Sequence, residues 1–209
     1  MAPFKNLIFD IGNVIIDIDY AVPIREFQKL STVNFSEIVN YSKQHEVFNR
    51  FEKGEISVKE FHDVLRQFFK KDVSDEEILK AWNSILIHYP AEKFELLNTL
   101  KKSYRVLALS NINETHVNAI NAAAVEQLEV KAFSDFFHKA YYSNEIGMRK
   151  PDLEIYEFVL QQENLNASET FFVDDKIENV EAAKQVGLQA FQLEQPQHLF
   201  ELLTRLQII

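Results

Sequence analysis

Four short polar segments of the sequence carry side chains that could act together in catalysis. In chain order they are Asp10-Ile-Gly12-Asn13, Ser110-Asn111, Gly147-Met-Arg-Lys150-Pro151 and Asp174-Asp175. Each segment taken alone has an ordinary interpretation, because Asp, Asn and Ser often cap helices or form turns. Together, however, they supply three carboxylates, a lysine and a hydroxyl.

These groups suit a reaction on a phosphate ester. Three neighbouring carboxylates repel one another unless a cation neutralises them, and an all-oxygen site with few ligands suits Mg²⁺, which also bridges to phosphates. Lys150 supplies fixed positive charge, while Ser110 and backbone N–H groups at a helix N-terminus can bind a phosphoryl group. A carboxylate such as Asp10 can attack phosphorus and form an aspartyl-phosphate. The alternative is a purely structural cluster of ion pairs between Lys150 and the aspartates.

The polar segments follow apolar runs that predict the strands of a sheet. The runs are Asn6–Phe9, Arg105–Leu109, Lys139–Tyr142, Thr170–Val173 and Leu188–Leu193. Pro151 is expected in the first turn of one intervening helix, and Gly187 at the end of another that begins at Ile177. Alternating strands and helices indicate an α/β fold with a parallel sheet. Such sheets bind ligands at the carboxyl ends of their strands, where the polar segments would converge.

One region interrupts this alternation. Between about Asp19 and Tyr89 no convincing strand is present, but Ser57-Val-Lys-Glu60 and Ser74-Asp-Glu-Glu77 have the form of capping boxes at helix starts. We therefore expect a helical insertion. Its aromatic residues are expected to form a small core of their own: Phe27, Phe35, Phe48, Phe51, Phe61, Phe68, Phe69 and Trp82.

Composition excludes several classes of protein. The 209 residues carry a formal net charge of −10, which disfavours binding to nucleic acid, and no cysteine is available for disulfides or thiolate metal sites. No run approaches the roughly 20 apolar residues of a transmembrane helix, and the N-terminus lacks the pattern of a signal peptide. We expect a cytoplasmic protein with a small-molecule phosphorylated substrate and without a nucleic-acid or membrane partner.

The four segments resemble, in order, the four motifs of the haloacid dehalogenase (HAD) superfamily. The matching residues are Phe9 to Val14, Leu109 to Asn111, Gly147 to Pro151 and Phe172 to Asp175. Three segments, Asp10 to Asp19, Phe51 to Ser57 and Gly147 to Pro151, are most similar to bacterial α-D-glucose-1-phosphate phosphatases and to the phosphatase domain of soluble epoxide hydrolases. The resemblance implies a Rossmann-like core formed by residues 1–16 and 90–209, with a helical cap over residues 17–89.

The resemblance also implies individual roles. Asp10 would be the nucleophile and a Mg²⁺ ligand, and the backbone carbonyl of Gly12 a second ligand. Asp175 would be a further direct ligand, with Asp174 binding Mg²⁺ directly or supporting the site from behind. Ser110 and Asn111 would hold the phosphoryl group, and Lys150 would orient both nucleophile and phosphate. Asn179 is a candidate support for the metal site, although an ordinary position on a surface helix explains it equally well. Independently of the resemblance, His45 is a candidate contact for the substrate, although such a histidine is more often an ordinary surface or hydrogen-bonded residue.

Gly12 departs from the usual pattern of the superfamily. Most of its phosphatases have a second Asp at this position, which acts as general acid and base, and glycine has no side chain that could protonate a leaving group. Asp17 and Asp19 are nearby substitutes, although turn formation explains them equally well. Our first expectation is a Mg²⁺-dependent phosphatase of a small metabolite such as a hexose 1-phosphate. The alternatives are a metal-independent 2-haloacid dehalogenase that uses Asp10, and a phosphate-binding module without turnover.

Overall fold

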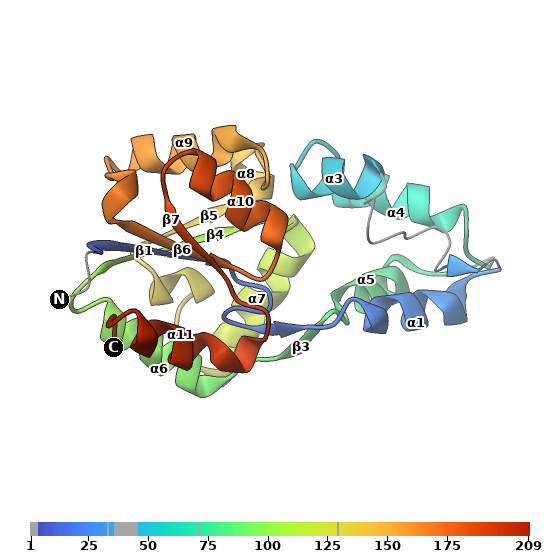
Figure 1. Cartoon of the computed structure of the whole chain (residues 1–209). Coiled ribbons are helices and arrows are strands. Elements are labelled where there is room, and N and C mark those ends of the chain that lie inside the picture. Colours follow the sequence, from blue (N-terminus) through green and yellow to red (C-terminus); the bar gives the residue numbers. More distant parts are fainter. Residues whose placement is uncertain (1–3, 33, 36–45, 71, 129) are drawn as a thin grey trace.

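A five-stranded parallel sheet forms the centre of the protein in the computed structural model, which describes residues 4–32, 34–35, 46–70, 72–128 and 130–209 (Figure 1). The strands lie in the order β5-β4-β1-β6-β7. Their bounds are β1 Asn6–Phe9, β4 Arg105–Ser110, β5 Lys139–Tyr142, β6 Thr170–Asp174 and β7 Gln189–Gln192. All five agree with the predicted runs to within two residues at either end. The chain leaves β1 toward β4 and β5 and later returns to the other side of β1, so the strand order reverses there.

Helices cover both faces of this sheet, as Figure 1 shows. On one face, Ile8, Leu107 and Phe172 pack against buried side chains of α9 (Leu153–Gln162) and α10 (Ile177–Gln185). On the other face, Leu7, Phe9 and Phe171 share a core with three helices: α6 (Ala91–Leu100), α7 (Glu114–Gln127) and α11 (Leu199–Arg205). Burial on both faces explains why the strands are continuous apolar runs rather than alternating ones. The α/β fold with a Rossmann-like parallel sheet is confirmed.

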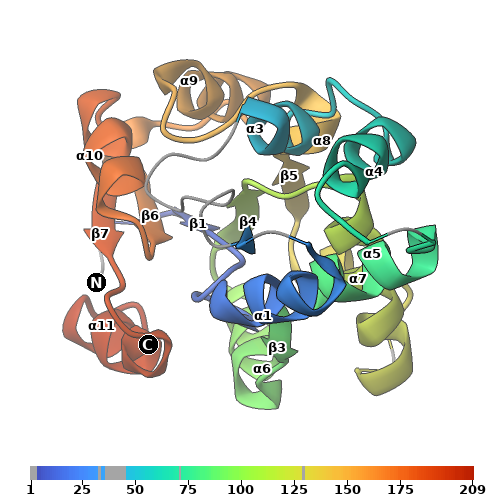
Figure 2. The same ribbon diagram turned by 90° about the vertical axis from the view of Figure 1, so that its right-hand side faces the viewer.

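The insertion after β1 is a separate helical lobe. Its described helices are α1 Ala21–Leu30, α3 Glu46–Glu52, α4 Val58–Arg66 and α5 Asp75–Asn83. Both predicted capping boxes are present: the Ser57 hydroxyl accepts from the N–H of Glu60, and the Ser74 hydroxyl accepts from the N–H of Glu77. His45 lies outside the described residues. In Figure 2, which looks at the molecule from the side of this lobe, β1, β4 and β5 are seen between α1 and α3.

The predicted absence of strands in the insertion is wrong at its end. Leu86–His88 forms β3, which pairs antiparallel with β2 (Asp17–Ile18). The two strands make a short ribbon where the chain passes between core and lobe (Figure 1). Strands this short show no recognisable period in sequence, and their partners are far apart along the chain.

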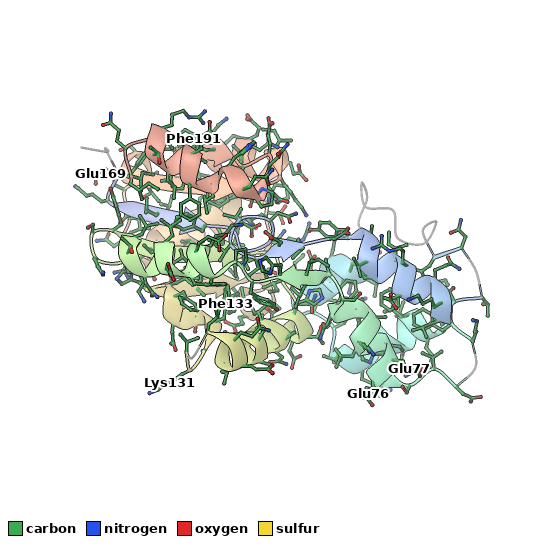
Figure 3. All side chains as sticks on the ribbon, turned by 90° about the horizontal axis from the view of Figure 1, so that it is seen from below. Glu76, Glu77, Lys131, Phe133, Glu169 and Phe191 are labelled. Carbon is green, nitrogen blue, oxygen red and sulfur yellow. The ribbon has the colours of Figure 1, made fainter. Side chains whose placement is uncertain are left out.

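The predicted aromatic core of the lobe is confirmed. Phe27, Phe35, Phe48, Phe51, Phe61 and Phe69 are buried in one cluster, and Phe68 and Trp82 pack against it. Phe51 and Phe61 stack with their ring centroids 4.2 Å apart. Figure 3 shows Glu76 and Glu77 of α5 on the outside of the lobe. Phe133 is not part of the lobe; it lies among the side chains packed against the parallel sheet.

Pro151 and Gly187 lie next to two helices of the core, α9 and α10. Pro151 does not stand in the first turn of α9, because the helix begins at Leu153 after its N-cap residue Asp152. Gly187 follows α10 as predicted, with a φ of 88° and its N–H donating to the carbonyl of Lys184. Only glycine adopts such a φ without strain. None of the helices in the described part of the chain has the length and apolar character needed to cross a membrane.

Candidate active site

Asp10 occupies the carboxyl end of the central strand β1. Its N–H donates to the carbonyl of Val173 at 2.9 Å, which extends the pairing with β6, and the residue is 8% exposed. Because β1 lies where the strand order reverses, polar residues that end β4 and β6 flank Asp10 on both sides. Ser110, the last residue of β4, is also buried there.

Lys150 links the polar segments into one cluster. Its Nζ donates to Asp10 Oδ1 at 2.8 Å, to Asp174 Oδ2 at 2.5 Å and to the carbonyl of Leu109 at 2.8 Å. The side chain is 1% exposed, so all three donors of the ammonium group are used inside the protein. The structure therefore brings together Asp10, Lys150 and Asp174 from three distant parts of the sequence.

Asp174 is the most deeply held of the carboxylates. Its Oδ1 accepts from Asn179 Nδ2 at 2.8 Å and from the N–H of Lys176 at 2.9 Å, while Oδ2 binds Lys150. Asn179, in the first turn of α10, is itself 3% exposed. These contacts fix the orientation of Asp174, and they give Asn179 the supporting position expected for it.

Asp175 is held from the other side of the site by Asn13. Asn13 Nδ2 donates to Asp175 Oδ2 at 3.1 Å, and Asn13 Oδ1 accepts from the N–H of Ile18 at 3.1 Å. Asn13 has a φ of 55°, a conformation that asparagine tolerates better than most residues. No function was predicted for Asn13 from the sequence. Its position three residues after Asp10, in a segment rich in turn-forming residues, was the one feature of the sequence that could have indicated a place in the site.

The three aspartates can hold a divalent cation. One carboxylate oxygen from each of Asp10, Asp174 and Asp175 lies within 4.8 Å of the others. Oxygens on opposite sides of a Mg²⁺ ion are roughly 4 Å apart, because each lies about 2.1 Å from the metal. A hard, oxygen-only donor set of this size fits Mg²⁺ better than a softer metal.

The cluster of Asp10, Asp174, Asp175 and Lys150 contains more carboxylates than ammonium groups. Burial raises the pKa of Asp10 to about 6; Lys150 opposes this change, whereas Asp174 and Asp175 add to it. Burial also raises the pKa of Asp175. For Lys150, burial disfavours the charged form, but the carboxylates of Asp10 and Asp174 outweigh it and raise the pKa above its usual value. The lysine thus stays charged, and one ammonium is insufficient for three carboxylates.

Asn111 contacts the backbone of Lys150 with both ends of its amide. Asn111 Nδ2 donates to the carbonyl of Lys150 at 2.7 Å, and Asn111 Oδ1 accepts from the N–H of Lys150 at 2.8 Å. This reciprocal pair fixes the backbone that carries the ammonium group. The side chain of Asn111 therefore positions Lys150, and a contact of Asn111 with the phosphoryl group is left to its backbone N–H.

Gly12 lies two residues after Asp10 and pairs with Ile16 through an isolated bridge. Its φ is not positive, so glycine is not required there by backbone conformation. A Cβ at this position would lie 2.7 Å from Ile18 Cδ1. The obstacle is the end of a side chain that can rotate.

The proposed substitutes for a general acid have other partners. Asp17 Oδ1 accepts from Lys93 Nζ at 3.4 Å. Asp19 Oδ1 accepts from the N–H of Ala21 at 2.8 Å, at the start of α1. The turn-forming interpretation of Asp19 is therefore supported.

The model of the haloacid dehalogenase-like hydrolase family matches residues 4–187 of the chain. The D-ribitol-5-phosphate phosphatase of Bacteroides thetaiotaomicron is 32% identical over 190 residues, which cover 91% of this chain and 92% of that protein. The sesquiterpene phosphatase astK of Aspergillus oryzae is 32% identical over 186 residues, which cover 88% of this chain and 87% of that protein.

A solved structure agrees with these relatives. The HAD family enzyme bt-2542 from Bacteroides thetaiotaomicron, in complex with magnesium, has a TM-score of 0.88 and 33% identity, covering 97% of this chain and 99% of that one. The structure of the wild-type enzyme with magnesium and inorganic phosphate has a TM-score of 0.80 and 34% identity, and the match covers 90% of this chain and 93% of that one. The narrower similarity to glucose-1-phosphate phosphatases and epoxide hydrolases stays a prediction, whereas the superfamily is confirmed. The chain belongs to the haloacid dehalogenase-like hydrolase family, a family of enzymes with phosphatases among the relatives of this chain.

Proposed function

We propose that this protein is a Mg²⁺-dependent phosphatase that hydrolyses a small sugar or polyol phosphate through an aspartyl-phosphate on Asp10. One observation carries the proposal: the buried ammonium of Lys150 joins Asp10 to Asp174 beside Asp175, at the reversal point of a parallel sheet. This arrangement supplies a fixed nucleophile, a fixed positive charge and a set of oxygen ligands.

Each residue has a definite part in the proposed reaction. Asp10 attacks phosphorus, the bond to the leaving oxygen breaks, and that oxygen takes up a proton from water. Water then attacks the phosphorus of the aspartyl-phosphate, which releases inorganic phosphate and restores the Asp10 carboxylate. Lys150 holds Asp10 in position throughout and stabilises charge on the phosphoryl oxygens, while Ser110 binds the phosphoryl group.

The metal would be held by Asp10, Asp175 and the carbonyl of Gly12, with Asp174 as a direct or water-mediated partner. Both oxygens of Asp174 already accept hydrogen bonds, which favours the water-mediated arrangement. Mg²⁺ would neutralise the carboxylates and the transferred phosphoryl group. The magnesium and phosphate complexes of bt-2542 support Mg²⁺ as the cation.

The two alternatives have less support. A metal-independent 2-haloacid dehalogenase needs no cation, and Asp174 and Asp175 would only repel its attacking carboxylate. A binding module without turnover rests on Gly12 alone, because the nucleophile, the lysine and the other carboxylates are all present.

A phosphate-release assay tests the proposed function. A panel of sugar phosphates, polyol phosphates and p-nitrophenyl phosphate is assayed with Mg²⁺ and with chelator, and Asp10→Asn serves as the control. We expect turnover that requires Mg²⁺ and falls by several orders of magnitude in Asp10→Asn, while the urea denaturation curve of the folded variant stays cooperative. Turnover that is indifferent to chelator, or near-normal turnover in Asp10→Asn, would refute the mechanism.

A further inference from the structure

Ser143 is a buried residue at the carboxyl end of β5 that the proposed reaction does not use. It directly follows β5 and begins the short helix α8 (Ser143–Ile146), which lies beside α3 of the lobe (Figures 1 and 2). Its relative exposure is 0%. Because β5 pairs with β4, Ser143 lies next to the residues that follow β4. We call residues 110–113, which contain Ser110 and Asn111, the β4 turn.

The Ser143 hydroxyl contacts three backbone groups. Its oxygen accepts from the N–H of Ile112 at 2.9 Å. Its proton has two carbonyl oxygens within reach, that of Glu52 in the lobe at 2.6 Å and that of Ile112 at 3.0 Å. A hydroxyl group has one proton, so the nearer carbonyl of Glu52 takes the larger share of it. The oxygen of Ser143 therefore stays directed at the N–H of Ile112.

This contact completes a double attachment of the β4 turn to residues 143–150. The side chain of Asn111 holds the backbone of Lys150, and the next residue, Ile112, is held by Ser143. A peptide unit is planar, so a fixed N–H of Ile112 also fixes the plane of the peptide that joins it to Asn111. The backbone of Asn111, between this plane and the end of β4, then has little freedom to turn.

We infer that Ser143 is a positioning residue for phosphoryl binding, whose hydroxyl holds the β4 turn in the geometry in which Ser110 and the N–H of Asn111 bind the phosphoryl group. The inference rests on the proposed function and adds a residue to its site. Donors that are fixed before the ligand arrives bind it better, because no ordering cost remains to be met on binding. The alternative is that the hydroxyl only satisfies buried backbone groups, without an effect on ligand binding.

Calorimetric titration of Ser143→Ala with inorganic phosphate at saturating Mg²⁺ tests the inference. The substitution adds no atoms, and the carboxylates proposed as Mg²⁺ ligands keep all their contacts. We expect the Kd for phosphate to rise about tenfold or more while the Kd for Mg²⁺ stays within about twofold of the wild type. The kcat/KM for p-nitrophenyl phosphate should fall about 10- to 100-fold, because small misplacements of binding groups are costly in the transition state. An unchanged phosphate affinity, or an equal loss of phosphate and Mg²⁺ affinity, would overturn the inference.

Two further variants separate positioning from packing and from stability. Ser143→Cys keeps the size of the side chain, but a thiol is a weak donor and a weak acceptor, so this variant should resemble Ser143→Ala. Wild-type phosphate affinity in Ser143→Cys would show that only volume matters and would contradict the inference.

Thr170→Val is the matched control for the loss of a buried hydroxyl. Thr170 is 0% exposed, its hydroxyl accepts from Asn6 Nδ2 at 3.0 Å and donates to the carbonyl of Asn166 at 2.7 Å, and it begins β6 at the end opposite Asp174. Thr170→Val and Ser143→Ala should both lower the urea midpoint, but only Ser143→Ala should weaken phosphate binding. Equal weakening of phosphate binding in both variants would indicate a general loss of stability and would count against Ser143.

Inorganic phosphate binds without turnover, so the binding result distinguishes this inference from the proposed function. A wild type that hydrolyses esters, together with unchanged phosphate affinity in Ser143→Ala, would overturn the inference and leave the proposed function intact. A wild type that hydrolyses no ester but binds phosphate more tightly than Ser143→Ala does would contradict the phosphatase and support the positioning role. A wild type that binds no phosphate at all in the presence of Mg²⁺ would contradict both.

Discussion

Replacement of Gly12 by Asp should supply a general acid at a position that has no side chain in this protein. The added carboxyl would stand two residues after the proposed nucleophile Asp10. The space for it depends on Ile18, whose Cδ1 lies 2.7 Å from the position of the new Cβ. Rotation of that side chain away from its present rotamer costs about 0.5–1.5 kcal/mol. No backbone strain is added, because the φ of Gly12 is not positive.

The expected gain depends on the leaving group. General acid catalysis contributes about 10²–10⁴-fold, which corresponds to roughly 3–5 kcal/mol of the activation free energy. The gain should appear with primary-alcohol phosphates, whose alkoxide leaves with difficulty. It should be small with aryl or anomeric phosphates, whose leaving groups are already acidic. Even after the steric cost, Gly12→Asp should be faster than the wild type on the poor leaving groups.

The assay measures kcat/KM across phosphates of graded leaving-group acidity. Gly12→Asn is the matched control, since it has nearly the same shape without an acidic proton, and Gly12→Ala reports the steric effect alone. The wild type should show a steep dependence on leaving-group acidity, which Gly12→Asp flattens and neither control changes. A wild type with no such dependence would refute the reasoning, because another group, with Asp17 the first to replace, would then supply the proton.

Three further predictions concern the charges of the site. Asp175→Ala should weaken Mg²⁺ affinity and activity together, and it should stabilise the metal-free protein because it removes repulsion between carboxylates. Calorimetric titration measures the Mg²⁺ affinity, and urea denaturation measures the stability. An unchanged Mg²⁺ affinity would exclude Asp175 as a ligand. Lys150→Met should lower the free energy of unfolding without metal by about 3–5 kcal/mol, because two carboxylates lose their buried partner. Lys5→Met, which removes the exposed pair with Glu169, should cost less than about 1 kcal/mol, and similar losses in both variants would contradict the buried role of Lys150. Finally, the pKa of Asp10 is raised from 3.8 to about 6, so the native state binds the extra proton and metal-free stability should fall as pH rises through this window. Asp10→Asn should lack this contribution to the pH dependence of stability. Saturating Mg²⁺ should abolish the contribution in the wild type, because the metal binds only the ionised carboxylate. Equal pH profiles of stability for the metal-free wild type and Asp10→Asn, measured by urea denaturation, would contradict the raised pKa of Asp10.

Local features of this fold were determined by the sequence itself. The apolar runs predicted the five core strands because a strand buried on both faces is apolar throughout. The capping boxes at Ser57 and Ser74 were readable because all their hydrogen bonds join residues three positions apart. Convergence of Asp10, Lys150 and Asp174 was predictable too, since the carboxyl ends of parallel strands meet at one edge.

Other features were decided only by tertiary structure. The ribbon of β2 and β3 pairs segments from opposite ends of the insertion, and each is too short to carry a period of its own. Asn111 was predicted to hold phosphate, yet its amide meets the backbone of Lys150, a partner set by how two loops pack. Glu52 of the helical lobe likewise pairs with Arg149 of the core only because the lobe packs on the core. Sequence periodicity reports which residues are buried, whereas the partner of a polar side chain depends on the relative placement of segments that are distant in the chain.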